Sequence, residues 1–218
     1  MATEVDAASA TLDWLEGRYG VMHSRDVMRL VSRITKRLSS SVYKTALETE
    51  LKGNSPDRYG ENFPWQVFVL NSTEPFAGSL GGGMIILTKG LLLRTGTEAE
   101  LASIIAHEMS HQILGHTREA LSESDLSTSG PQFAFSLEQE LDADRLGLKL
   151  LQVSRYFLAD AAHALTIVYR PLDEVVATNE PNWLPIRLAN LHQYTRELEN
   201  GLPATQSTRE FNRVRKSL

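Results

Sequence analysis

Apolar residues recur at intervals of three and four from Asp26 to Leu51, which is the spacing of an amphipathic helix. The apolar positions of this segment are Val27, Leu30, Val31, Ile34, Leu38, Val42, Ala46 and Leu47. The other face is rich in arginine and lysine, so we expect a helix with one buried side. The turn-rich stretch Lys52–Asn62 should link this helix to the next element.

Two short apolar runs predict strands. Trp65–Leu70 is aromatic and β-branched, and Met84–Thr88 follows a glycine-rich stretch, Gly78–Gly83. That stretch is not a phosphate-binding loop, because no Lys-Ser or Lys-Thr pair follows it and the strand comes after the glycines. The run Met84–Leu87 fits either an open sheet edge that pairs with an extended peptide or an ordinary core strand.

Longer helices are predicted in the second half of the chain. The first spans about 97–115, where Thr97 and Glu100 form a T-x-x-E capping box and Gly115 ends the helix. Helical spacing continues from Ser136 to about Tyr169, and a last helix is predicted over Asn182–Asn200. The polar stretch 122–132 between the first two helices fits a lid over a cleft or a simple connector.

Composition narrows the possible classes of protein. A length of 218 residues suits one domain, 1–218, of α+β class, mainly helical with a small sheet beside the 97–115 helix. The chain has no cysteine, which excludes disulfide scaffolds, thiolate zinc fingers and cysteine nucleophiles, so only imidazole and carboxylate can hold a metal. A net charge of −5 gives no electrostatic footprint for nucleic acid.

Signals for export and membrane insertion are not expected in this chain. No apolar stretch approaches the roughly 18 residues that a spanning helix needs. The first ten residues, MATEVDAASA, have neither a basic start nor an apolar core, so they do not resemble a signal peptide.

The segment His107–His111 is an H-E-x-x-H sequence inside the predicted 97–115 helix. A spacing of four residues puts both imidazoles on one helical face, where they can share a tetrahedral metal ion. Glu108 is displaced around the helix, so its carboxylate can reach a metal-bound water. The alternative is a buried helix whose histidines are only hydrogen-bonded. Burying two histidines and an acid on one apolar helix costs free energy unless each group is paired or bound to a metal.

A third metal ligand is needed, because catalytic zinc usually has three protein ligands and a water. The densest acidic segment is Glu138–Asp144, in which Glu140 and Asp144 share one helical face. One carboxylate could bind the metal while the other accepts a ring N–H of a ligand histidine. The alternative is an exposed acidic turn. Other candidate ligands are Glu119, Glu123, Asp125, Glu138, Asp142, His116 and His163.

These motifs resemble those of peptidase family M48, the zinc metallopeptidases that include the CAAX prenyl endoproteases, the heat-shock protease HtpX and the mitochondrial Oma protease. The resemblance covers about residues 65 to 150. It rests on H-E-x-x-H with His116 after it, on E-L-D-A-D-R-L-G at Glu140–Gly147, and on the glycine-apolar run Gly82–Leu87. It implies a gluzincin-like fold of the compact soluble branch, with Glu140 as third zinc ligand and Asp144 as the acid that orients a ligand histidine.

The chain departs from the family pattern in two places. The family's N-A-F-A-x-P-G-G segment is altered, and its late H-P-…-R segment remains only as Pro181 and Arg187, with Glu180 in place of the histidine. At the first place, the residues found instead of asparagine, phenylalanine and proline are Phe76, Gly78 and Gly81.

The resemblance implies a zinc-dependent endopeptidase with one Zn²⁺ per chain, held by His107, His111 and Glu140. Glu108 would be the general base that takes the proton of the attacking water. A polypeptide substrate would be bound by residues Gly83, Met84, Ile85 and Arg187. Candidates for stabilising the oxyanion are Arg187, His163, Tyr169 and Tyr194.

The resemblance also favours the periplasm or cell envelope over the cytoplasm, with a role in protein quality control. One rival hypothesis is a zinc-binding, chaperone-like or regulatory module with little proteolytic activity. Another is a helical interaction protein with a fortuitous motif, which predicts no stoichiometric metal.

Overall fold

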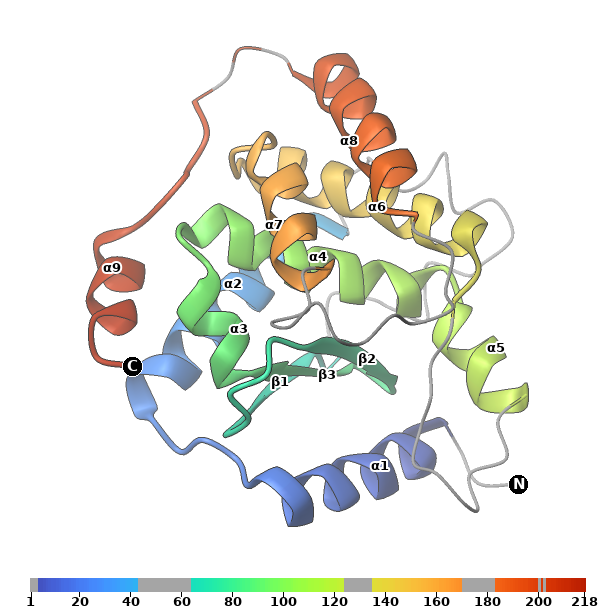
Figure 1. The fold of residues 1–218 in the computed structure, drawn as a ribbon, viewed down its shortest axis with the longest axis vertical. Coiled ribbons are helices and arrows are strands. Elements are labelled where there is room, and N and C mark those ends of the chain that lie inside the picture. Colours follow the sequence, from blue (N-terminus) through green and yellow to red (C-terminus); the bar gives the residue numbers. More distant parts are fainter. Residues whose placement is uncertain (1–3, 43–63, 124–134, 170–182, 200, 202) are drawn as a thin grey trace.

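The computed structural model describes residues 4–42, 64–123, 135–169, 183–199, 201 and 203–218. The helices are α1 (Glu4–Tyr19), α2 (Arg25–Val42), α3 (Lys89–Arg94), α4 (Glu98–Ile113), α5 (His116–Glu123), α6 (Leu137–Val153), α7 (Asp160–Tyr169), α8 (Leu184–Leu198) and α9 (Arg209–Arg215). The strands are β1 (Gln66–Leu70), β2 (Ala77–Gly81) and β3 (Met84–Thr88). This mainly helical arrangement with a small sheet confirms the predicted α+β class (Figure 1).

The three strands form one sheet in the order β1-β3-β2. Strand β3 pairs in parallel with β1, where Val67 faces Ile85, and antiparallel with β2, where Ser79 faces Ile85. Of the two alternatives for Met84–Leu87, the core strand is confirmed and the open edge is wrong, because β3 is the central strand and β2 is an edge. The uniformly apolar sequence of β3 suits a strand buried on both faces, while the small, glycine-rich β2 gave no strand signal.

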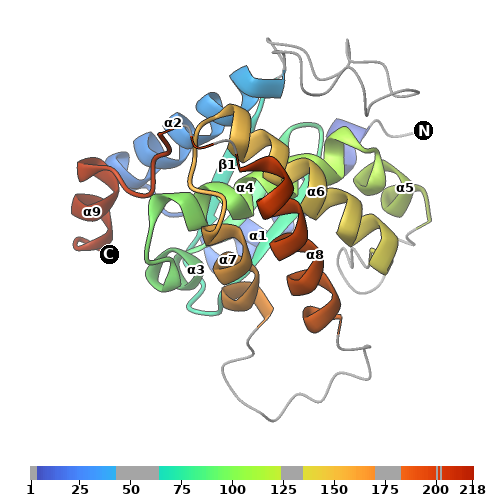
Figure 2. The same ribbon diagram turned by 90° about the horizontal axis from the view of Figure 1, so that it is seen from above.

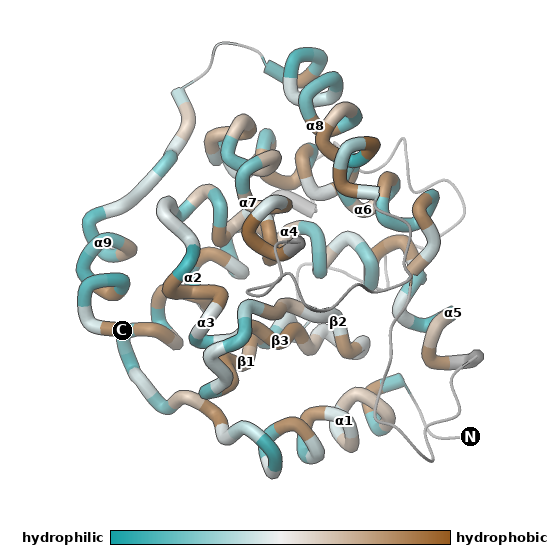
Figure 3. Tube along the Cα trace, viewed as in Figure 1, coloured by the Kyte–Doolittle hydropathy of each residue, from teal (hydrophilic) through white to brown (hydrophobic). Residues whose placement is uncertain are grey.

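Two apolar layers cover the two faces of the sheet (Figures 1 and 3). On one face, Ala8 and Leu12 of α1 pack against Leu80 and Ile86. On the other face, α2 and α4 form the main core, to which α6, α7 and α8 add further apolar side chains. Seen from above, α6 lies beside α4, and α8 packs on α6 (Figure 2). Helix α4 is consequently enclosed along almost its whole length.

The limits of α4 are those that the sequence predicts. The Thr97 hydroxyl accepts the Glu100 N–H at 3.1 Å, and the Glu100 carboxylate accepts the Thr97 N–H at 3.3 Å, which completes the capping box. After the helix, Gly115 adopts φ +86°, a left-handed conformation that costs glycine little. The chain then turns and begins α5.

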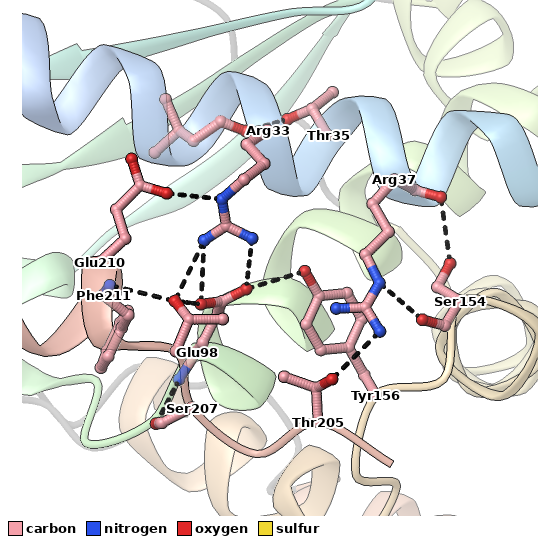
Figure 4. Close-up of polar contacts among 12 residues, drawn as sticks. Arg33, Thr35, Arg37, Glu98, Ser154, Tyr156, Thr205, Ser207, Glu210 and Phe211 are labelled. Carbon is pink, nitrogen blue, oxygen red and sulfur yellow. Dashed lines mark hydrogen bonds and ion pairs between the residues drawn. The ribbon is translucent and has the colours of Figure 1, made fainter. Parts of the chain in front are cut away.

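A polar cluster also fixes the start of α4 (Figure 4). The Glu98 side chain has an exposed fraction of 0%. Its carboxylate accepts hydrogen bonds from both terminal nitrogens of Arg33, at 2.8 and 3.0 Å. The hydroxyls of Tyr156 and Thr208 donate to the same carboxylate. Arg33 in turn donates to Glu210 at 2.7 Å. This cluster, which we call the Glu98 clasp, joins α2 and α9 to the first turn of α4.

The predicted helix from Ser136 to Tyr169 is wrong in one respect, because the chain forms two helices there. Helix α6 ends at Val153, and α7 begins at Asp160. Between them Arg155 has φ 57°, which no continuous helix allows. The apolar spacing did not reveal this break because both helices carry buried residues at helical intervals.

Two further predicted helices are confirmed, and two predicted connecting stretches fall wholly or mostly outside the described residues. The helix predicted from Asp26 is confirmed as α2 up to Val42, and the last predicted helix is confirmed as α8. The predicted link Lys52–Asn62 and most of the polar stretch 122–132 lie outside the described residues. Helices α1, α3, α5 and α9 were not predicted. No helix among the described residues is long and apolar enough to cross a membrane.

Candidate metal centre

The two histidines of the H-E-x-x-H segment meet Glu140 between α4 and α6. One ligand atom from each of His107, His111 and Glu140 lies within 4.8 Å of the other two. The Nε2 atoms of the two histidines are 3.0 Å apart, and Glu140 oxygens lie 3.3 Å from His107 Nε2 and 3.8 Å from His111 Nε2. A tetrahedral zinc ion with bonds of about 2.0–2.1 Å separates its ligand atoms by about 3.3 Å. The three donors fit such an ion.

The charge of this group also favours a cation. Burial opposes protonation of His107, but hydrogen bonds with Asp144 and Glu140, and the charges of these acids, raise the pKa of His107 to about 10. The two carboxylates thus attract positive charge to the place where the donor atoms meet. Burial holds the pKa of His111 well below its usual value, so this imidazole is neutral and keeps a lone pair for a metal.

Asp144 lies one helical turn beyond Glu140 and is buried. Its Oδ1 is 3.0 Å from Nδ1 of His107, on the side of the ring away from the other donors. This is the position expected of an acid that orients a ligand histidine, the role that the family resemblance implies for Asp144. Burial alone would raise the pKa of Asp144, but Arg187 and His107 outweigh it and lower the pKa.

Arg187 of α8 contacts both acids and has an exposed fraction of 2%. Its Nε and Nη2 lie 2.8 and 2.6 Å from the two oxygens of Asp144, and its Nη1 is 2.5 Å from Oε2 of Glu140. We expected Arg187 to contact substrate. Its guanidinium is instead buried against carboxylates of the protein itself, which corrects that expectation.

Glu108 faces the edge strand β2. It is buried, and the backbone N–H of Ser79 donates to its carboxylate. Burial raises the pKa of Glu108 to about 7, although His107, Arg187 and the Ser79 N–H oppose the shift. A carboxylate with a pKa near neutrality is well matched to proton transfer.

The remaining residues expected to bind substrate are engaged within the protein. The Gln112 side chain accepts the Gly83 N–H at 2.7 Å and donates to the Met84 carbonyl at 3.0 Å. Ile85 is fully buried in the middle of the sheet. The prediction that these three residues contact substrate therefore loses its basis, and the edge next to Glu108 belongs to β2.

Two rings beside His111 complete the centre. His116, a candidate ligand in the sequence, has its Nδ1 3.1 Å from Nδ1 of His111, on the side away from the other donors. Phe135 stacks on His111 with ring centroids 3.8 Å apart and planes inclined by 15°. Phe135 was missed because the sequence around it carries no signal for a contact with α4.

Other residues that the sequence offered as metal ligands or oxyanion stabilisers have different contacts. His163 contacts Glu100 at the opposite end of α4, at 2.6 Å, and Tyr194 lies under the guanidinium of Arg145. Glu119 accepts a hydrogen bond from Gln139 at 3.0 Å. The described geometry brings together His107, His111 and Glu140, the ligand set that the family resemblance implies.

An H-E-x-x-H helix packed beside a glutamate-bearing helix defines a candidate metallopeptidase centre. The model of peptidase family M48 matches residues 37–137, so the predicted resemblance to this family is confirmed. The match includes His107 and His111 but ends before Glu140. Glu140 therefore belongs to the candidate donor group on the basis of its position in the structure.

Named relatives agree with this class. The chain is 26% identical over 125 residues to "Mitochondrial metalloendopeptidase OMA1" of Arabidopsis thaliana, covering 48% of this chain and 26% of that protein. It is 25% identical over 150 residues to "Beta-barrel assembly-enhancing protease" of Escherichia coli (strain K12), covering 54% and 30%. The matched parts thus span less than a third of either relative. The family and these names support a metalloendopeptidase, as predicted.

Proposed function

We propose that this chain is a zinc-dependent endopeptidase with a gluzincin-like centre, in which His107, His111 and Glu140 hold one zinc ion. The observation that carries the proposal is the convergence of these three donors beside Glu108. Two imidazoles and one carboxylate at tetrahedral spacing, with no cysteine in the chain, suit catalytic zinc.

The residues around the donors have separate tasks in this proposal. Bound zinc would acidify a water molecule and polarise the scissile carbonyl. Glu108 accepts the proton of the attacking water and passes it to the leaving amine. Asp144 holds the ring of His107, and Arg187 holds Glu140 and Asp144 together in their ionised forms.

A polypeptide substrate would lie along β2. This strand pairs with β3 on one side and has no strand partner on the other among the described residues. The backbone N–H of Ser79 in β2 donates to the Glu108 carboxylate, which supports a substrate position beside the proposed general base. An extended peptide could bind there by main-chain hydrogen bonds, which suits cleavage within a chain.

The cell envelope is the proposed location, with protein quality control as the proposed role. The names of the two relatives, a mitochondrial metalloendopeptidase and a beta-barrel assembly-enhancing protease, support this part of the proposal. Fractionation of cells that express the chain from its own gene should find it in the envelope fraction. Recovery in the cytosol alone would remove this part.

The test combines metal analysis with casein digestion. The wild-type chain should carry about one zinc and cleave casein. Glu108→Gln should keep the zinc and lose cleavage, whereas His107→Ala and Glu140→Ala should lose both. Glu138→Ala, an exposed change on the same helix as Glu140, and His192→Ala are matched controls that should behave as wild type.

Three results would count against the proposal. A wild-type chain without zinc would remove the metal site. Undiminished cleavage by Glu108→Gln would remove the general base. Bound zinc without cleavage in the wild-type chain would favour the chaperone-like or regulatory module instead.

A further inference from the structure

His116 and His111 form a pair of buried rings in direct contact. Their Nδ1 atoms are 3.1 Å apart, and the ring planes meet at 65°. His111 has an exposed fraction of 1% and His116 of 8%, so water has little access to this contact. The Nδ1 atom of each ring therefore depends on the other ring for a hydrogen bond.

The contact exists because the helix is broken between the two residues. In a continuous helix, residues five apart point about 140° away from each other around the axis. Here Gly115, with φ +86°, ends α4 and lets His116 begin α5 in a new direction. The Thr117 hydroxyl lies 2.9 Å from that of Ser79, which ties α5 to β2 and fixes the position of His116.

The geometry requires a particular tautomer of each ligand histidine. A neutral imidazole that binds a metal through Nε2 carries its hydrogen on Nδ1. For His107, the Asp144 carboxylate lies on that side of the ring, with Oδ1 3.0 Å from Nδ1. For His111, Nδ1 of His116 lies on that side, and no carboxylate takes that place among the described contacts of His111 Nδ1.

We propose that His116 is a positioning residue whose Nδ1 accepts the Nδ1–H of His111. This bond fixes the tautomer and the rotation of the His111 ring, while the stacked Phe135 fixes its plane. The inference rests on the proposed metal site and adds the partner through which His111 is held.

Two substitutions separate the hydrogen bond from the volume of the side chain. His116→Phe fills the space without an acceptor, and His116→Asn offers an amide oxygen at the position of Nδ1. Zinc affinity of the full chain is measured by competition with a chromophoric chelator. We expect His116→Phe to bind zinc about 10–100-fold more weakly, His116→Asn to stay within about threefold of wild type, and the exposed control His192→Phe to be unchanged.

Thermal unfolding of the metal-free variants shows whether each one folds. If His116→Phe does not fold, NMR of the zinc-loaded wild-type chain decides: His111 should show a slowly exchanging Nδ1–H, and its absence would overturn the proposal. Wild-type zinc affinity in a folded His116→Phe would also overturn it, as would equal weakening in His116→Asn. Failure of the wild-type chain to bind zinc would instead remove the proposed function on which this inference rests.

Discussion

Arg187 and Asp144 form a buried two-point ion pair, with Nε and Nη2 of the guanidinium 2.8 and 2.6 Å from the two carboxylate oxygens. The residues are 43 positions apart and belong to α8 and α6. Because the same guanidinium contacts Glu140, one side chain balances the charge of two acids at the centre.

Removal of this guanidinium should destabilise the metal-free protein. Arg187→Ala removes the guanidinium from buried Asp144 and partly buried Glu140, so we expect the free energy of unfolding to fall by about 3–5 kcal/mol. Arg187→Lys should restore only part of the loss, because an ammonium group cannot form the two-point contact. Urea unfolding measures both values. Arg196→Ala, an exposed change on the same helix, is the control, and an equal loss there would contradict the account.

The Glu98 clasp predicts a dependence of stability on pH. Burial opposes ionisation of Glu98, but hydrogen bonds from Arg33 and Thr208 and the charge of Arg33 outweigh it, so the pKa is lowered from 4.5. A lowered pKa in the folded state contributes stability that is present above the unfolded-state pKa and is lost as the pH falls through the folded-state pKa. Wild-type stability should therefore fall more steeply below about pH 4.5 than that of Glu98→Gln.

Urea unfolding of both proteins between pH 6 and pH 3 measures this difference. The comparison cancels the titration of the other acids, which both proteins share. Parallel curves for the two proteins would show that the clasp does not depend on the charge of Glu98.

Two glycines should respond in opposite directions to alanine. A Cβ on Gly90 would lie 1.9 Å from the carbonyl oxygen of Thr73, a backbone atom that cannot yield easily. We expect Gly90→Ala to cost about 2–3 kcal/mol of folding free energy. A Cβ on Gly17 of α1 would meet nothing within 4 Å, so Gly17→Ala should stabilise by about 0.5–1 kcal/mol. Thermal unfolding compares them, and a destabilised Gly17→Ala would contradict the described packing.

Zinc should stabilise the folded protein through the proposed ligands. A ligand that binds only the folded state adds about 4.1 kcal/mol at a free concentration of 1,000 times its Kd. We expect a chelator to lower the melting temperature of the wild-type chain and zinc to restore it. Glu140→Ala should not respond to zinc, whereas Glu138→Ala should. A response in Glu140→Ala equal to that of wild type would move the third ligand elsewhere.

The predictable parts of the molecule are those that depend on local spacing. The capping box of Thr97 and the pairing of His107 with His111 involve residues three or four positions apart, which a helix brings together by itself. The uninterrupted apolar run of β3 and the apolar spacing of three and four in α2 likewise located these two elements. The contact of α4 with Glu140 came from the family resemblance, and the distances agree with it.

The parts that were missed depend on tertiary packing. Arg187 reaches Asp144 only after α8 has packed on α6, and spacing along the chain contains no record of that contact. Strand β2 owes its conformation to pairing with β3, since its own residues are mostly small. Contact between His111 and His116 required the break at Gly115, which the sequence marked only as a helix end.

The Glu98 clasp also bears on how the molecule folds. Glu98 contacts Arg33 at a sequence separation of 65 and Thr208 at a separation of 110, so the clasp raises the contact order of the chain. Large loops must close before either contact forms, and their closure costs chain entropy. The capping box, within three residues, needs no such closure. We therefore expect α4, the helix that bears both histidines, to nucleate at its capping box. The Glu98 clasp should form later in folding.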